Sequence, residues 1–216
     1  MEFKEYKIEK FIEDLSSDMP SPGGGNVAAL TAALSASLNS MVYSLTLNKK
    51  SFDKLDEEAQ KLVLDCKEFS SRFTKKALRF MDEDREAFMK LMEAYKLKKD
   101  SEEEKKIRNT KILEGTVKAM DVPLKLTKEA YKFYDYIDVA VDYGNKMLAS
   151  DAGCAAILLH AAIESSIINV KVNLNSLREK KMAIAIEEEI NNIAKKSLMR
   201  KEDICKKVND IIYPNE

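Results

Sequence analysis

Three consecutive acidic residues are the first candidates for chemistry in this sequence. Asp82, Glu83 and Asp84 precede Arg85 in a stretch whose apolar residues recur at helical spacing. An acidic run on a helix commonly forms a face that contacts solvent and has only a structural role. If one of these carboxyls instead faces a pocket, desolvation raises its pKa and suits it to proton transfer near neutral pH.

A glycine-rich segment is the second candidate. Residues 20–25 read Pro20-Ser21-Pro22-Gly23-Gly24-Gly25 and lead into a long apolar stretch. Glycines at the start of a helix let a ligand reach backbone N–H groups, where the helix dipole favours anions. The segment matches neither the nucleotide P-loop nor the dinucleotide-binding fingerprint. A sharp turn between helices explains the three glycines equally well.

Polar side chains within apolar helical stretches form a third group. Asn169 and Asn173 are four residues apart, so they share one helix face, and most of their neighbours are Ile, Val and Leu. Buried amides need hydrogen-bond partners, either in neighbouring helices or on the polar edge of a bound heterocycle. His160 and Glu164 have the same spacing, and we interpret them as a structural pair.

The cysteine and histidine content argues against a metal centre. The chain has three widely spaced cysteines, Cys66, Cys154 and Cys205, and His160 is its only histidine. This pattern fits neither a disulfide framework nor a zinc site. It also excludes the histidine–cysteine signature of zinc deaminases. We therefore expect no metal site.

The elements that must position these groups are predicted to be helices. Only 6 glycines and 4 prolines occur in 216 residues, which leaves few of the turns that strands require. Ser101 and Glu104 form a capping box, Pro123 suits the first turn of a helix, and Ser150 can cap a helix whose first turn holds Asp151. We predict one all-helical domain over residues 1–216. Its helices are expected at about 5–16, 26–47, 54–96, 122–142, 150–176 and 177–212, with one more helix that begins after residues 98–106 and ends near residue 120.

Small residues dominate two of these predicted helices. Ala28, Ala32 and Ala36 recur every four residues, and the stretch after Asp151 is also rich in alanine. Most of these alanines are expected to allow close packing of helices. The alternative is that they leave room for a flat ligand or a symmetry-related helix.

Composition narrows the class of protein. Charged residues make up 34% of the chain and hydrophobic residues 45%, with a net charge of −1. This balance argues against a general nucleic-acid binder. Residues 26–48 carry no charge and are long enough to span a bilayer, but they contain many hydroxyl and amide side chains. We predict a buried core helix there and a cytoplasmic protein without a membrane partner.

Several segments together resemble the cyclodeaminase/cyclohydrolase family. This family includes the cyclodeaminase domain of formiminotransferase-cyclodeaminase and the methenyltetrahydrofolate cyclohydrolases. The resemblance covers roughly residues 8–178, in order along the chain. It is carried by Pro20-Ser21-Pro22-Gly23-Gly24-Gly25-Asn26-Val27-Ala28-Ala29, Asp84-Arg85-Glu86-Ala87-Phe88, Pro123, Gly144-Asn145, Ser150-Asp151-Ala152-Gly153 and Asn169-Val170-Lys171-Val172-Asn173-Leu174.

The resemblance implies an all-helical, dimeric, cytoplasmic folate enzyme with a tetrahydrofolate derivative as substrate. A cyclodeaminase joins N10 to the formimidoyl carbon on N5 and releases ammonia, forming 5,10-methenyltetrahydrofolate. A cyclohydrolase adds water to the methenyl carbon and opens the ring to 10-formyltetrahydrofolate. Both reactions need a proton carrier, and neither requires a metal or a redox cofactor.

The resemblance and the residue types together indicate roles for individual residues. Asp84 aligns with the catalytic aspartate of the family, and Asp82 is the fallback. The remaining assignments concern substrate binding: Asp151, Asn169 and Asn173 for the pterin edge, Gly23, Gly24, Gly25 and Asn26 for the pocket floor, and Lys96 and Arg108 for the glutamate tail. The family usually has Ser where this chain has Asn26, and often Lys-Leu-Pro-Lys where it has Lys96-Leu97-Lys98-Lys99. The alternative is a non-catalytic helical dimer or a folate-binding module.

Overall fold

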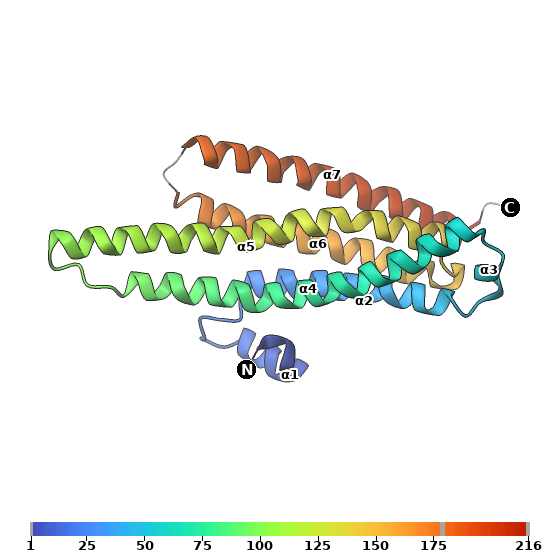
Figure 1. Cartoon of the computed structure of the whole chain (residues 1–216), viewed down its shortest axis with the longest axis horizontal. Helices are drawn as coiled ribbons and strands as arrows, with labels where there is room; N and C mark the ends of the chain where they lie inside the picture. The colour runs from blue at the N-terminus through green and yellow to red at the C-terminus, as the bar shows by residue number, and fades with distance from the viewer. Residues whose placement is uncertain (1, 178–179, 215–216) are drawn as a thin grey trace.

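The computed structural model describes residues 2–177 and 180–214. Within these ranges the chain forms seven α-helices and two short 3₁₀ segments, with no strand, which confirms the all-helical prediction (Figure 1). Residues 178 and 179, at the predicted start of the last helix, lie outside the described ranges. The elements are η1 (Phe3–Glu5), α1 (Ile8–Leu15), α2 (Gly24–Thr46), α3 (Lys50–Asp53), α4 (Glu57–Tyr95), α5 (Glu102–Tyr143), η2 (Lys146–Leu148), α6 (Ala149–Leu174) and α7 (Lys180–Ile212).

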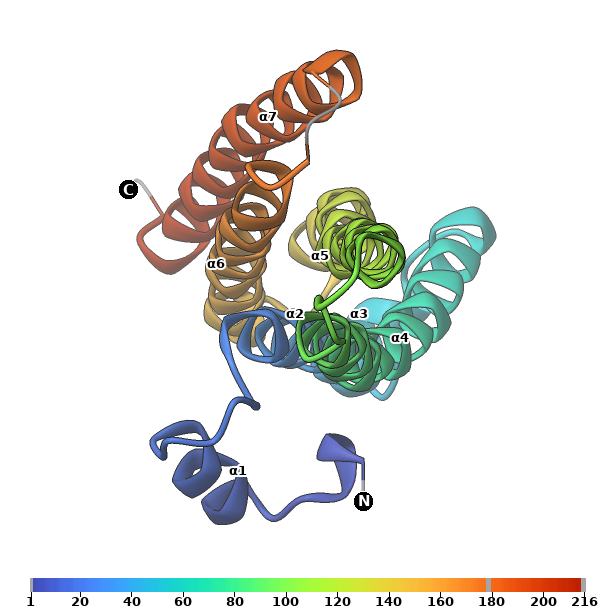
Figure 2. The same ribbon diagram turned by 90° about the vertical axis from the view of Figure 1, so that its left-hand side faces the viewer.

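Four long helices enclose the core. Helix α2 packs on both α4 and α6, and α5 closes the bundle against α4 and α6 (Figure 2). The small residues of α2 make this possible, because Ala28, Ala32 and Ala36 are fully buried, as are Ala152 and Ala156 of α6. Their short side chains let the helix backbones approach closely. The close-packing interpretation of these alanines is therefore confirmed.

Helix α5 corrects the sequence prediction at Pro123, which lies inside this helix and not in the first turn of a new one. A proline has no N–H, so the carbonyl of Ala119, four residues earlier, loses its helical donor. In the structure Nδ2 of Asn173 donates to that carbonyl at 3.3 Å, and Oγ of Ser166 donates to the carbonyl of Pro123 at 2.8 Å. Side chains of α6 therefore supply hydrogen bonds at the interruption, and α5 continues through it.

The predicted helix ends are partly confirmed. Oγ of Ser101 accepts from the N–H of Glu104 at 3.2 Å, and Oε2 of Glu104 accepts from the N–H of Ser101 at 3.1 Å, so the capping box starts α5. Helix α5 ends before Gly144, as expected. The prediction for Ser150 is wrong, because α6 begins at Ala149 and Ser150 lies within its first turn together with Asp151.

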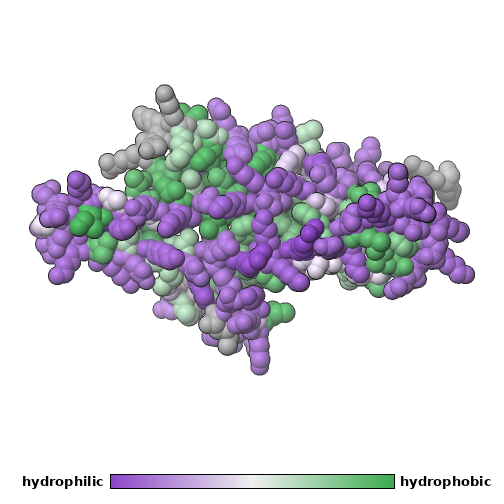
Figure 3. Space-filling view, in the orientation of Figure 1, coloured by the Kyte–Doolittle hydropathy of each residue, from purple (hydrophilic) through white to green (hydrophobic). Residues whose placement is uncertain are grey.

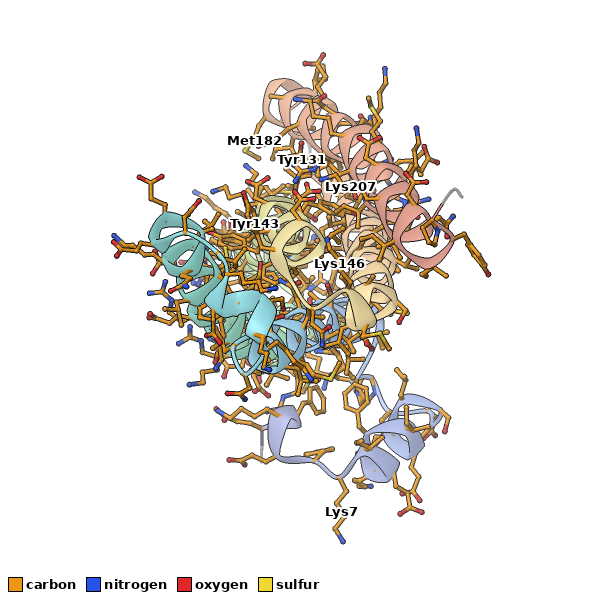
Figure 4. The ribbon with its side chains drawn as sticks, turned by 90° about the vertical axis from the view of Figure 1, so that its right-hand side faces the viewer. Lys7, Tyr131, Tyr143, Lys146, Met182 and Lys207 are labelled. Carbon is orange, nitrogen blue, oxygen red and sulfur yellow. The ribbon has the colours of Figure 1, made fainter. Side chains whose placement is uncertain are left out.

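Helix α7 packs along the outside of α5 and α6. Nζ of Lys207, which is labelled in Figure 4, lies 3.2 Å from Asp138 and 3.1 Å from Asp142 of α5. His160 takes part in the same contact, because its Nδ1 lies 2.8 Å from Oγ of Ser197 on α7. Its Nε2 lies 3.7 Å from Glu164. The structural interpretation of His160 is therefore confirmed.

The N-terminal segment lies beside the bundle and not within it. Figure 2 shows α1 apart from the long helices, and Lys7 points away from them in Figure 4. Its anchor on α4 is a hydrogen bond of 2.8 Å from the N–H of Phe3 to Oδ1 of Asp82. The Arg85 guanidinium lies over the Phe3 ring, 4.6 Å from its centre. A cation over an aromatic face is attractive, so both contacts hold the segment in place.

Among the described residues, two helical stretches are long and apolar enough to cross a membrane by length and composition alone. They are α2 and the stretch Lys146–Leu174, and half of each apolar window is buried within the bundle. Core helices of water-soluble proteins commonly meet the same criterion. The burial of Asn39 and Ser35 along α2 agrees with the predicted core helix.

Candidate functional site

A cavity of about 340 Å³ opens where the first turn of α2 meets α4, α5 and the C-terminal half of α6. It brings together the acidic, glycine and asparagine candidates from three separate parts of the sequence. Its size falls in the range that small-molecule sites usually have. The lining residues are Pro20, Ser21, Gly23, Gly24, Gly25, Asn26, Asp84, Phe88, Leu91, Met92, Tyr95, Thr116, Ala119, Asn169, Val172, Asn173 and Ser176.

Asp84 is the acidic residue that faces this cavity. Its carboxyl is half-buried and has no hydrogen-bond or ion-pair partner among the described residues. Desolvation therefore acts without compensation and raises the pKa of Asp84 to about 6. A carboxyl with such a pKa can accept and return a proton near neutral pH.

Gly25 allows the carboxyl to lie where it does. A Cβ atom added to Gly25 would lie 2.5 Å from Cγ of Asp84 and would overlap both carboxyl oxygens. Real Cβ atoms do not approach other atoms this closely. The carboxyl of Asp84 therefore rests on the backbone of α2, at its second residue, and only glycine leaves this space.

Gly24 and Gly23 differ from Gly25 in their surroundings. A Cβ added to Gly24 would lie 3.4 Å from Nδ2 of Asn169, so Gly24 places the backbone close to that amide. A Cβ added to Gly23 would meet nothing within 4 Å, and the Gly23 backbone is extended. Three successive glycines therefore serve different purposes, and only Gly25 is sterically required.

Asn26 connects the glycine segment to α4. Its side chain is buried, with Oδ1 accepting from the N–H of Gly23 at 2.7 Å and from Oγ of Ser21 at 3.4 Å. Its Nδ2 donates to the carbonyl of Met81 at 2.7 Å. Both polar atoms of the Asn26 side chain therefore form hydrogen bonds within the protein. Asn26 thus positions the site and does not present a free amide to a ligand.

Asn169 and Asn173 line the opposite wall on successive turns of α6. Nδ2 of Asn169 donates to the carbonyl of Ser165 at 2.8 Å, and Nδ2 of Asn173 donates to the carbonyl of Asn169 at 3.0 Å. Within the described ranges, neither Oδ1 atom accepts a hydrogen bond. Two amide oxygens are thus available to donors on a ligand.

Asp82 does not line the cavity. Its Oδ1 accepts the N–H of Phe3, and the Arg85 guanidinium lies 4.0 Å away. Residues two positions apart on a helix point in nearly opposite directions, so Asp82 and Asp84 do not face the same space. The fallback assignment of Asp82 as proton carrier is corrected, because this carboxyl anchors the N-terminal segment.

Three further candidates also lie outside the cavity lining. Arg108 donates from Nη2 to the carbonyl of Tyr95 at 3.2 Å, and its guanidinium lies 5.9 Å from the centre of the Tyr95 ring. Lys96 is exposed at the end of α4. Asp151 is in the first turn of α6, about 27 Å along the helix from Asn169. The structure thus brings Arg108 to the rim but does not bring Asp151 to this cavity.

Sequence reasoning missed the apolar and aromatic part of the lining. Phe88, Leu91, Met92 and Tyr95 follow Asp84 at helical spacing on α4. A signal was present, because residues at i+4, i+7, i+8 and i+11 lie on the same side of a helix as Asp84. Once Asp84 is assumed to face a pocket, the apolar residues at these positions become its walls.

The chain is similar to several known proteins. The family described as formiminotransferase-cyclodeaminase matches residues 7–192. A methenyltetrahydrofolate cyclohydrolase of Methylorubrum extorquens is 35% identical over 82% of this chain and 83% of its own length. The formimidoyltransferase-cyclodeaminase of Mus musculus is 32% identical over 80% of this chain, which spans 31% of that longer protein.

A solved structure shares the fold. The formiminotetrahydrofolate cyclodeaminase of Thermotoga maritima superposes with a TM-score of 0.77 at 24% identity, covering 97% of each chain. The family match covers most of the chain and includes every lining residue of the cavity. The chain therefore belongs to the formiminotransferase-cyclodeaminase family.

Proposed function

We propose that this protein is a folate enzyme that acts on the one-carbon unit between N5 and N10 of tetrahydrofolate. It is a formimidoyltetrahydrofolate cyclodeaminase, a methenyltetrahydrofolate cyclohydrolase, or both. The observation that carries the proposal is the unpartnered, half-buried carboxyl of Asp84, which faces a cavity between the glycine backbone and two free amide oxygens.

Asp84 serves as the proton carrier in either reaction. In deamination, the carboxylate takes the proton from N10 as N10 joins the formimidoyl carbon, and it returns a proton to the nitrogen that leaves as ammonia. In hydrolysis, it takes a proton from the water that adds to the methenyl carbon and returns it to N5 as the C–N5 bond breaks. The remaining hydroxyl proton is released to solvent as the formyl C=O bond forms. A pKa of about 6 leaves most of this group ionised at pH 7 and ready to accept a proton.

The pterin ring binds against the wall opposite Asp84. The ring edge carries an amide N–H and an exocyclic amine, both of which are donors. The Oδ1 atoms of Asn169 and Asn173 are matching acceptors on one face of α6. Phe88 and Leu91 supply apolar surface for the ring faces. These steps need only a proton carrier, so tetrahydrofolate enters as substrate and no resident cofactor is part of the proposal.

Exposed apolar side chains on the outer faces of α2 and α6 support a homodimer. Leu34 of α2 is 50% exposed, and Ile157 and Ile168 of α6 are 53% and 63% exposed. Helix α2 has no charged residue along its whole length. Large apolar side chains gathered on the surface of a protein often mark an interaction surface. We assign it to a second copy in the cytoplasm, with no nucleic-acid or membrane partner, and expect Ile168→Glu to produce monomers in analytical ultracentrifugation.

Two spectroscopic assays test the activity. With 5-formimidoyltetrahydrofolate, the purified protein should generate the near-ultraviolet absorbance of 5,10-methenyltetrahydrofolate. With 5,10-methenyltetrahydrofolate, that absorbance should decay faster than in buffer. A folded protein that accelerates neither reaction contradicts the enzymatic proposal. Calorimetry with tetrahydrofolate then separates a non-catalytic binding module, which gives heat of binding, from a protein with no folate site.

A further inference from the structure

The interruption of α5 at Pro123 lies beside the candidate site. Pro123 is buried on the side of α5 that faces α6, whereas Figure 3 shows hydrophilic residues over much of the surface that α4 and α5 present in that view. Because proline has no N–H, the carbonyl of Ala119 lacks the donor that an unbroken helix supplies. Ala119 lines the cavity, so the carbonyl that loses its helical donor belongs to a residue of the cavity wall.

Asn173 takes the place of the missing donor. Its Nδ2 atom lies 3.3 Å from the carbonyl oxygen of Ala119 and 3.0 Å from that of Asn169. Carbonyl oxygens only accept hydrogen bonds, so the NH₂ end of the amide must face these two partners. The Oδ1 end is left for a ligand, because Asn173 lines the cavity. The two carbonyls therefore determine which end of the amide a ligand meets.

The two carbonyls do not hold the amide equally. In an α-helix the carbonyl of Asn169 already accepts the backbone N–H of Asn173, so Nδ2 shares that acceptor. The Ala119 carbonyl has no such helical donor, because the residue four positions later is Pro123. Ala119 is 8% exposed, and a buried acceptor left without a donor is unfavourable. The hydrogen bond to Ala119 is therefore the stronger restraint on the amide of Asn173.

We propose that Pro123 is a positioning residue for substrate binding, an inference that rests on the proposed function. By leaving the Ala119 carbonyl without a helical donor, the proline holds Nδ2 of Asn173 on that carbonyl and keeps Oδ1 turned toward the N–H groups of the pterin. Any residue with an N–H at position 123 satisfies Ala119 from within α5. The amide of Asn173 then keeps only its shared acceptor, rotates more freely, and meets the ligand with its oxygen for a smaller part of the time.

Isothermal titration calorimetry with tetrahydrofolate tests this coupling in a double-mutant cycle. Pro123→Ala should weaken binding about fivefold, which corresponds to the loss of one hydrogen bond that orients the amide. In an Asn173→Ala background the same substitution should leave the affinity unchanged, because there is no amide to orient. Pro123→Val also restores the N–H, with a side chain closer in volume, and provides a second variant in case Pro123→Ala does not fold.

Steady-state kinetics give a readout that a general disturbance of the fold would not reproduce. Asn173 contacts the pterin edge and not the reacting carbon, so its contact is the same in the bound substrate and in the transition state. Removing such a contact raises KM and leaves kcat unchanged. In the methenyltetrahydrofolate assay, Pro123→Ala should therefore raise KM about fivefold with kcat near that of the wild type.

Ser166→Ala is the matched control. Oγ of Ser166 also crosses from α6 to α5, where it donates to the carbonyl of Pro123 at 2.8 Å, but Ser166 is buried and does not line the cavity. The carbonyl of Pro123 keeps a second donor, the hydroxyl of Thr127 at 2.9 Å. Ser166→Ala should therefore bind tetrahydrofolate as the wild type does.

Three results would overturn the role of Pro123. They are wild-type affinity in folded Pro123→Ala or Pro123→Val, a loss of affinity that is equal with and without Asn173, and an equal loss in Ser166→Ala. In each case the wild type still binds tetrahydrofolate, so the proposed function stands. If the folded wild type neither binds nor converts folates, the proposed function fails together with this inference.

Discussion

Gly25 and Gly23 provide a matched pair of substitutions that tests the position of the Asp84 carboxyl. In Gly25→Ala the new Cβ would lie 2.5 Å from Cγ of Asp84, whereas ordinary contact begins at 3.4 Å. The carboxyl must therefore move by about 1 Å. A misplacement of about 1 Å at a reacting group can lower the rate about 100-fold. Gly23→Ala adds the same atom where nothing lies within 4 Å, so it should leave the Asp84 carboxyl in place and lower the rate much less.

The expected effect on stability separates this result from unfolding. Gly25 is the second residue of α2 with helical backbone, and replacing glycine with alanine in a helix usually stabilises it by up to about 1 kcal/mol. The thermal midpoint of Gly25→Ala should therefore stay near that of the wild type while kcat falls. The assay follows 5,10-methenyltetrahydrofolate by its near-ultraviolet absorbance. A Gly25→Ala rate within threefold of wild type, or an equal loss in Gly23→Ala, would refute the reasoning.

Three more predictions follow from the same contacts. Asp84→Asn should lower kcat about 100-fold or more, while Asp82→Asn should leave it within a few fold of wild type; equal losses would contradict the separate roles. Because the pKa of Asp84 is raised to about 6, ionisation of this carboxyl at higher pH disfavours the folded state. Asp84→Asn should therefore raise the thermal midpoint at pH 7.5, and this gain should vanish toward pH 4. Asn173→Ala should reduce the free energy of unfolding by about 1 kcal/mol, since Ala119 loses a donor. In a Pro123→Ala background the backbone N–H replaces that donor, so denaturant titration should show a smaller loss there.

Much of the architecture could be predicted because its signals are local. The scarcity of glycine and proline, the apolar spacing and the Ser101 capping box each act within a few residues, and α2, α4 and α6 begin and end near the predicted positions. The prediction that a new helix starts at Pro123 was wrong because the effect of this proline is not local. The donor that compensates for the missing N–H comes from Asn173, which is on another helix.

The candidate site was predictable in its main groups but not in its extent. The cavity brings together residues from the motifs that carry the resemblance, namely Gly24, Gly25, Asp84, Asn169 and Asn173. The apolar and aromatic walls of the cavity depend on how α4 packs against α2 and α5. Packing of this kind leaves no short motif in the sequence.

Asn26 shows how a residue can matter to a site without presenting a free group to the ligand. Its side chain joins the N–H of Gly23 to the carbonyl of Met81, which precedes Asp84 by three residues on α4. The same hydrogen bonds thus fix both the start of α2 and the helix that carries the carboxyl. A serine at this position, as the resemblance would imply, has a shorter side chain and a single polar atom with which to span the two groups. Asn26 has a separate acceptor for the N–H of Gly23 and a separate donor for the carbonyl of Met81. It can therefore hold the start of α2 against α4, where Gly25 meets Asp84.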